Sequence, residues 1–264
     1  MYKPLEMNST QIKQSITFDC RWNLKDAVKV FLAYVIFMFV GMPVIARLIN
    51  TIVGSNILSE SVRHSVVLFV TLFINLIICL YVFYIVRVEY RQSITTLGLS
   101  IVSLSDNIKQ GIKRYLITLP FIILAGFIIN LISSYYGIAP DMQDVIKWLL
   151  GEKSIFVVVS LILFGIIIAP IMEEIIFRGF IQSALKNSFG KQYAILISAL
   201  LFAAVHMDIF AFLQIFILGV LLGNLYEKTQ TLAASIVVHI LHNSLTMVFL
   251  LYFKYYLKGK VPVF

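Results

Sequence analysis

Apolar residues fall in seven long runs separated by short polar or basic segments. The runs lie near residues 27–50, 65–86, 115–134, 155–187, 192–206, 209–226 and 230–253. Most of them approach the ~20 residues that a helix needs to cross the hydrocarbon core of a bilayer. The pattern therefore predicts an all-α fold, a polytopic membrane helix bundle with about seven to eight transmembrane helices.

Three segments lie outside these runs. Residues 1–26 are polar and contain no apolar h-region, so no signal peptide is expected. A short surface helix is expected before the third run, because Ser105 and Asp106 suit a helix N-cap. Residues 135–152 are expected not to span, although a re-entrant segment or an eighth crossing there stays open. Without repeats or linkers, residues 1–264 are predicted to form a single integral membrane domain.

Composition agrees with a multi-pass protein of the cell membrane. Hydrophobic residues make up 60% of the chain and charged residues only 13%, whereas soluble domains are nearer half apolar and a quarter charged. The net charge is +8. Because most Lys and Arg residues flank the apolar runs, we interpret them as topology signals and lipid contacts, and nucleic acid is not an expected partner.

The basic residues also predict an orientation. With seven crossings, the side of the N-terminus collects the five basic residues of 87–114 together with Lys228. The positive-inside rule therefore favours a cytoplasmic N-terminus. The basic residues near the C-terminus then lie on the opposite side, a conflict that an eighth crossing would remove.

Ionisable groups inside membrane spans are costly and indicate function by default. Lys29 and Arg47 lie near span ends and can snorkel. Those in the cores of the runs all fall in the second half of the chain, so residues 155–253 are predicted to form the motif-bearing core and the first three runs a scaffold. They are Glu173, Glu174, Arg178, His206, His239 and His242.

The depths of these groups agree. Each depth is the distance along a helix from the expected turn at the end of its run, at a rise of about 1.5 Å per residue. By this measure Glu173 lies about 21 Å deep and His206 about 22 Å. His239 and Asn243, one helical turn apart, lie roughly 14 and 20 Å deep. Polar side chains from three helices are therefore expected to meet at one level.

Helical spacing gives the two adjacent glutamates different directions on the helix. Glu174 and Arg178 are four residues apart and can form a buried pair. Glu173 points about 100° away and is left for another partner. Phe202, four residues before His206, can form a wall beside its ring. His242 is interpreted as an interhelical hydrogen-bonding residue.

A carboxylate with two imidazoles suits two mechanisms. In one, Glu173 and a histidine activate a water that attacks a peptide carbonyl, while His239 and Asn243 stabilise the oxyanion. In the other, a metal takes part, with His206, His239 and Glu173 as its expected site and zinc as the expected ion. The sequence leaves both open.

Three motifs resemble those of the CPBP intramembrane proteases, the family of CAAX prenyl proteases and bacterial Abi-type proteins. Glu173 to Arg178 resembles its EExxxR motif, Phe202 to His206 its FxxxH motif and His239 to Asn243 its HxxxN motif. They occur in the family's order, and the compact chain resembles bacterial members.

The resemblance implies hydrolysis of a peptide bond in a membrane-associated protein or peptide. It implies that Glu173 is the water-activating base, that His206 assists or binds metal, and that His239 and Asn243 hold the oxyanion or complete a metal site. Glu174 and Arg178 would support them structurally. Whether the enzyme is of the metallo- or the glutamate type is left open.

Two alternatives come from other classes. A proton-coupled transporter could use the same groups as a relay, although its inverted repeats would place polar groups in both halves of the chain. A non-catalytic scaffold or bacteriocin-immunity protein would function without Glu173 and His206.

Overall fold

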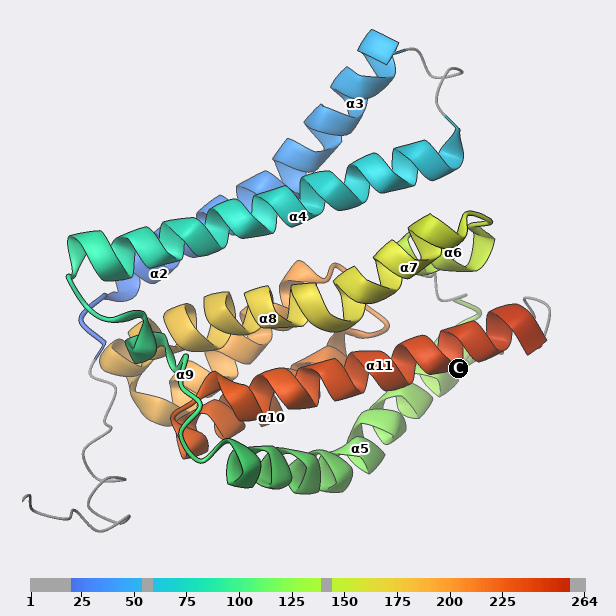
Figure 1. Ribbon diagram of the computed structural model, residues 1–264. Helices are drawn as coiled ribbons and strands as arrows, with labels where there is room; N and C mark the ends of the chain where they lie inside the picture. The colour runs from blue at the N-terminus through green and yellow to red at the C-terminus, as the bar shows by residue number, and fades with distance from the viewer. Residues whose placement is uncertain (1–19, 54–58, 139–143, 257–264) are drawn as a thin grey trace, which may run out of the picture.

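The computed structural model describes residues 20–53, 59–138 and 144–256, and within these ranges the chain is helical without strands. The N-terminal helices form one side of the bundle (Figure 1). Helix α2 (Leu24–Ile36) passes through a π-helical turn, η1 (Phe37–Gly41), into α3 (Met42–Val53). Helix α4 (Glu60–Tyr84) runs beside them and ends in a second π-helical turn, η2 (Ile85–Glu89).

Helix α5 corrects one prediction. After the short 3₁₀-helix η3 (Ile94–Leu97), a single helix runs over Leu104–Tyr135, so the expected surface helix is continuous with the third run. Its N-cap is Ser103 and not Ser105. The polar first turns continue directly into the apolar ones because no proline separates them, and a helix tolerates the single Gly111 at a modest cost. Pro120 lies further along, inside the helix.

The fourth apolar run forms a helix of changing pitch. It comprises α7 (Ile155–Leu163), η4 (Phe164–Ile168), α8 (Ala169–Glu174) and η5 (Ile175–Gln182), of which η4 and η5 are π-helical. It continues into α9 (Ser183–Val205), which is broken at Gly190. Gly190 has φ +77°, a conformation that glycine adopts without strain. The turn predicted near residue 190 is confirmed.

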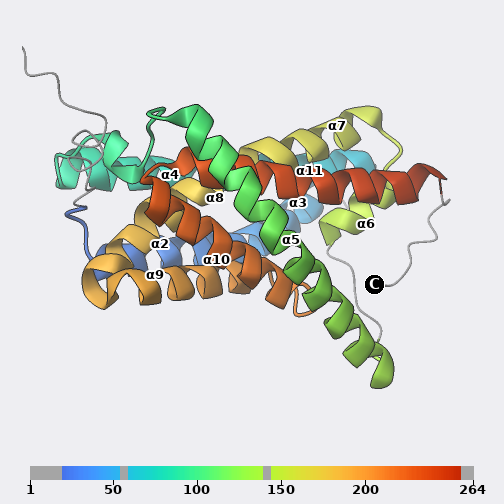
Figure 2. The same ribbon diagram turned by 90° about the horizontal axis from the view of Figure 1, so that it is seen from below.

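The last two helices complete the bundle. Helices α10 (Phe212–Thr229) and α11 (Leu232–Tyr256) follow α9, and α5 packs across both of them (Figure 2). Helix α8 lies between α4 and α11 (Figure 1). The eight-residue α6 (Asp144–Gly151) is only about 12 Å long, too short to cross a membrane.

Five of the described helical stretches are long and apolar enough to cross a membrane. Ile155–Val205 includes the break at Gly190 and so contains two of the predicted runs, while α10 is a helix of 18 residues outside this set. Each of the seven predicted runs therefore contains a helix, as expected for a multi-pass membrane protein. The five are Leu24–Ile45, Glu60–Glu89, Leu104–Tyr135, Ile155–Val205 and Leu232–Tyr256.

The core centres on η5, all eight residues of which are buried. Trp22 stacks on Phe180 with ring centroids 5.3 Å apart, and its Nε1 donates to the Phe180 carbonyl at 2.9 Å. The described end of the predicted polar segment 1–26 thus reaches the core, where Trp22 is fully buried. Residues 1–19 lie outside the described residues. The N-terminal end of the bundle therefore holds the central helix in place.

A polar cluster around Glu152 joins three elements away from this core. The Glu152 carboxylate accepts from Ser61 Oγ at 2.6 Å and from the backbone N–H groups of Lys153 and Ser154 at 2.8 Å. Its other oxygen lies 2.9 Å from Nδ1 of His64 on α4. These hydrogen bonds, the Ser61 bond foremost, lower the pKa of Glu152 to about 2.

Glu152→Gln tests this cluster by its pH dependence. Because the folded-state pKa of Glu152 lies below its ordinary value of about 4.3, its ionised form stabilises the folded chain above that pH. We expect the variant to melt about 2–4 °C below the wild type at neutral pH, the effect of about 1 kcal/mol. The difference in melting temperature between the variant and the wild type should become smaller as pH falls from about 4.5 towards 2. A constant difference across that range would contradict an ionised Glu152.

Candidate active site

The central polar residues lie on a helical segment with two changes of pitch. Helix α8, which ends at Glu174, lies between the π-helical segments η4 and η5. Such wide turns occur frequently at functional sites. They shift the angular register of the flanking residues, so Glu173 and Arg178 do not follow the regular spacing of a single α-helix.

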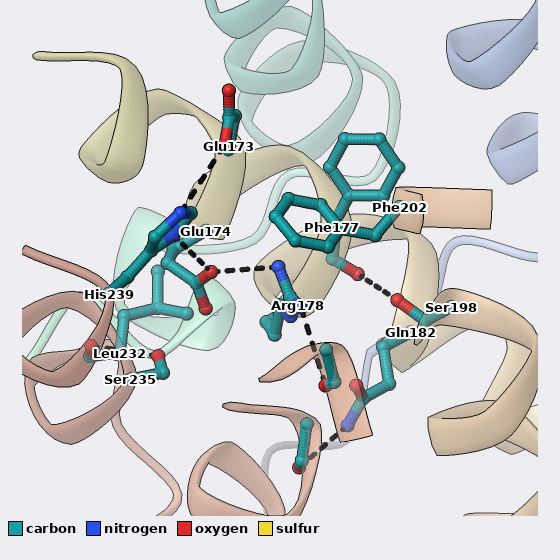
Figure 3. A network of polar contacts seen from close by, with 12 residues as sticks. Glu173, Glu174, Phe177, Arg178, Gln182, Ser198, Phe202, Leu232, Ser235 and His239 are labelled. Atoms are coloured by element: carbon teal, nitrogen blue, oxygen red, sulfur yellow. Dashed lines mark hydrogen bonds and ion pairs between the residues drawn. The ribbon is translucent and has the colours of Figure 1, made fainter. Parts of the chain in front are cut away.

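Glu174 and Arg178 form the predicted buried pair (Figure 3). Arg178 Nη1 lies 2.7 Å from Glu174 Oε1, and neither side chain has exposed surface. Arg178 also donates from Nη2 to the Gly219 carbonyl at 3.3 Å, and its guanidinium lies 4.2 Å from the centre of the Phe202 ring. The pair joins α8 and η5 to α9 and α10, which supports a structural role.

His239 on α11 contacts both neighbouring carboxylates. Its Nδ1 lies 3.1 Å from Glu174 Oε1, and its Nε2 lies 3.7 Å from Glu173 Oε2. An ionised carboxylate only accepts hydrogen bonds, so Glu174 fixes the proton of His239 on Nδ1. The Nε2 atom of His239 is then left facing Glu173.

Glu173 differs from Glu174 in its exposure. The Glu173 side chain retains 16% of its surface, whereas that of Glu174 has none. Figure 3 shows the Glu173 carboxylate directed away from the Glu174–Arg178 pair. Of the two adjacent acidic residues, Glu174 thus belongs to a buried ion pair, and Glu173 keeps an accessible carboxylate.

His206 approaches the same site through Phe202. The His206 ring lies 4.7 Å from that of Phe202, which in turn lies 5.6 Å from the His239 ring. The predicted wall beside His206 is thereby confirmed. His206 Nδ1 lies 2.7 Å from the Phe202 carbonyl, so it donates there and leaves Nε2 available.

Asn243 is bound to the π-helical turn below the site. Its Nδ2 donates to the Gly165 carbonyl at 2.8 Å. In the register of η4 the backbone donor to this carbonyl would be residue 170, which is a proline without an N–H. Asn243 therefore satisfies a carbonyl that Pro170 leaves unpaired. One further amide N–H of Asn243 is available for another acceptor.

His242 and Gln182 are buried or partly buried polar residues outside the predicted catalytic set. His242 Nδ1 lies 3.0 Å from Tyr115 Oη, which confirms the predicted interhelical hydrogen bond. The sequence analysis missed Gln182, whose Nε2 donates to the Gly223 carbonyl at 3.1 Å. The available signal was its spacing, because Gln182 follows Arg178 by four residues and continues the same buried face.

The donor set offers a partial fit to zinc. Both His206 and His239 bind through Nδ1 and present Nε2, as metal-ligating histidines commonly do. However, no three His, Cys, Asp or Glu side chains among the described residues lie close enough together to hold a metal ion. The arrangement therefore does not form the expected zinc site, and we derive no catalytic step through a metal. Zinc stays a prediction.

Glycines allow α9 and α10 to pack closely beneath this site. Gly219 and Gly223 form a small-xxx-small pattern, which is typical of closely packed membrane helices. A Cβ atom at Gly219 would lie 3.0 Å from Ala199 Cβ and 3.1 Å from Ala199 Cα. The close approach also brings the Gly219 carbonyl within reach of Arg178.

We expect Gly219→Ala to destabilise the protein by about 1–3 kcal/mol, because the helix backbones would have to separate. The measurement is thermal unfolding of the purified protein in detergent. Gly41→Ala is the control, since its Cβ would meet nothing closer than Phe37 Cδ1 at 3.6 Å. Equal melting temperatures for the two variants would contradict the tight α9–α10 contact.

Comparison with known proteins identifies the motif-bearing segment. Residues 155–245 match the family model described as "Type II CAAX prenyl endopeptidase Rce1-like". The resemblance inferred from the three motifs is confirmed for residues 155–245. This segment contains Glu173, His206, His239 and Asn243, and also the buried Glu174–Arg178 pair.

Two curated relatives overlap with the chain. "Putative membrane peptidase YdiL" of Bacillus subtilis is 31% identical over 133 residues, which are 47% of this chain and 54% of the relative. "Membrane-embedded CAAX protease MroQ" of Staphylococcus aureus is 35% identical over 95 residues, 33% of this chain and 38% of the relative. The chain thus spans about half or less of their length. No solved structure matches it significantly.

Proposed function

We propose that this protein is an intramembrane endopeptidase that hydrolyses a peptide bond of a membrane-associated protein or peptide. One observation carries the proposal: Glu174 is held by Arg178 and His239, while the adjacent Glu173 keeps an accessible carboxylate opposite His239 Nε2. An Rce1-like segment containing this arrangement supports the same activity.

The 3.7 Å between Glu173 Oε2 and His239 Nε2 is too long for a direct hydrogen bond. A water that bridges the two atoms from one side of the line joining them can donate one proton to each. Its lone pairs then face outward, where the carbonyl carbon of a substrate can approach. We therefore assign Glu173 as the general base and His239 as the residue that orients the water.

The remaining steps need an oxyanion donor and a proton for the leaving amine. Attack by the water forms a tetrahedral intermediate, and we assign the available N–H of Asn243 on α11 as the donor to its oxygen. Glu173, now protonated, then gives its proton to the leaving nitrogen as the C–N bond breaks. We assign His206 to assist from the Phe202 side of the site.

The proposal is tested by comparing newly formed peptide ends in membranes that contain the wild type or the Glu173→Gln variant. We expect at least one membrane protein or peptide to be cleaved only with the wild type. Glu89→Gln, an exposed carboxylate at the end of η2, is the matched control and should cleave normally. Retained biological function without any Glu173-dependent cleavage would favour the scaffold alternative.

A chelator separates the two mechanisms once a substrate is found. Glutamate-type chemistry predicts unchanged cleavage after chelator treatment and no stoichiometric metal in the purified protein. Loss of cleavage that zinc restores would instead support a metal-dependent mechanism, for which His206, His239 and Glu173 are the expected ligands.

A further inference from the structure

A basic notch lies between α5 and α10, apart from the proposed active site. Its volume is about 660 Å³, which is within the range of small-molecule binding sites. Figure 2 shows the two helices crossing in this part of the bundle. The lining residues are Gln110, Lys113, Arg114, Ile117, Thr118, Leu221 and Lys228.

The cations of the notch are not neutralised by the protein. Among the described residues, Lys113, Arg114 and Lys228 form no ion pair, whereas the buried Arg178 and the half-exposed Lys186 each have an acidic partner. Three positive charges that line one notch favour an anionic ligand. Lys228 lies in the last turn of α10, on the side predicted to be cytoplasmic.

The notch continues into an apolar surface. Lys113, Ile117, Phe121 and Leu124 follow one another at helical spacing and share one face of α5. The three apolar side chains are more than half exposed, at 59%, 61% and 52%. This face changes from charged to apolar near residue 115, where the predicted membrane span begins. A ligand with a charged end and an apolar body fits this change.

We propose that the notch binds the phosphate group of an anionic phospholipid, with the acyl chains lying along Ile117, Phe121 and Leu124. Basic pockets between transmembrane helices on the cytoplasmic side suit such headgroups. A free phosphate would use the same cations but not the apolar face. The inference does not depend on peptidase activity.

The test is lipid binding to the purified full-length chain in detergent, followed by native mass spectrometry. The probes are phosphatidylglycerol and phosphatidylcholine with identical acyl chains. We expect the wild type to prefer phosphatidylglycerol. The triple variant Lys113→Gln/Arg114→Gln/Lys228→Gln should bind it about 100-fold more weakly, since each basic residue near an anionic surface contributes about fivefold.

Two control variants separate local from general charge effects. Lys25→Gln/Arg87→Gln/Lys191→Gln removes the same charge from exposed positions outside the notch and should retain binding. Lys113→Arg/Arg114→Lys/Lys228→Arg preserves the charge and should also retain it, which keeps the test valid if the neutral variant fails to fold.

Three results would overturn the proposal. Equal losses of phosphatidylglycerol binding in the notch variant and in the Lys25→Gln/Arg87→Gln/Lys191→Gln control would show general charge attraction only. Inorganic phosphate that displaces phosphatidylglycerol and binds as tightly would show a free-phosphate site. A notch variant that binds lipid normally but no longer cleaves substrate would indicate an acidic segment of the substrate as the ligand.

Discussion

Replacing Glu173 by Gln should abolish peptide hydrolysis while leaving the protein folded. The amide keeps the size of the side chain but cannot accept a proton from water. General acid–base groups contribute about 10²–10⁴-fold to rate. Because Glu173 is assigned both proton transfers, from the water and to the leaving nitrogen, the loss of rate should be at the large end of this range or leave no detectable cleavage. The measurement is cleavage of the identified substrate by purified protein in detergent or vesicles.

The same variant should be nearly as stable as the wild type. Glu173 forms no short hydrogen bond with a protein group among the described residues, and its side chain is partly exposed. Substitutions at such positions usually change stability by about 0.5 kcal/mol or less. Glu174→Gln is the informative comparison, because it should lower both stability and activity. Normal cleavage by Glu173→Gln would refute its assignment as the base.

Replacing Arg178 by Ala should give the largest loss of stability. The Glu174 carboxylate would stay buried beside His239 without its arginine partner, and the Gly219 carbonyl would lose its hydrogen bond from Arg178. Breaking a buried ion pair from one side typically costs about 3–5 kcal/mol. Folded proteins have only about 5–15 kcal/mol in total, so we expect a markedly lower melting temperature and little active protein.

Arg87→Ala is the matched control for this prediction, because Arg87 is exposed in η2, the turn that follows α4, and should tolerate the change. A double variant, Glu174→Gln/Arg178→Gln, should recover part of the lost stability, since it removes the buried charges together. An Arg178→Ala protein that melts like the wild type would show that the pair does not hold the four helices together.

The distribution of polar groups predicted several of the contacts between buried side chains, because burying charge in a membrane is so costly. Glu174 and Arg178 had to pair, and a four-residue spacing allows it. His242 was correctly interpreted because a histidine outside the motifs still needs a hydrogen-bonding partner. The depth argument for Glu173 and His239 rested only on helical rise, and the two side chains do face each other.

Sequence spacing could not predict the register of the central helix. Two π-helical segments flank α8, and each inserts a residue into the regular repeat. Their consequence is visible at Asn243, which binds the Gly165 carbonyl that Pro170 leaves without a donor. The predicted surface helix before residue 115 failed for a related reason: a change from polar to apolar residues marks a membrane boundary and need not end a helix.

The sequence by itself determined the helical membrane fold, the motif-bearing half of the chain and the residues available for chemistry. These follow from local properties, namely the length of apolar runs and the rarity of charge within them. Only the tertiary structure decided how the two adjacent carboxylates are used. That division depends on contacts with α10 and α11: the Gly219 carbonyl of α10 binds Arg178, which pairs with Glu174, and His239 of α11 contacts Glu174 directly. Helix packing alone sets those contacts.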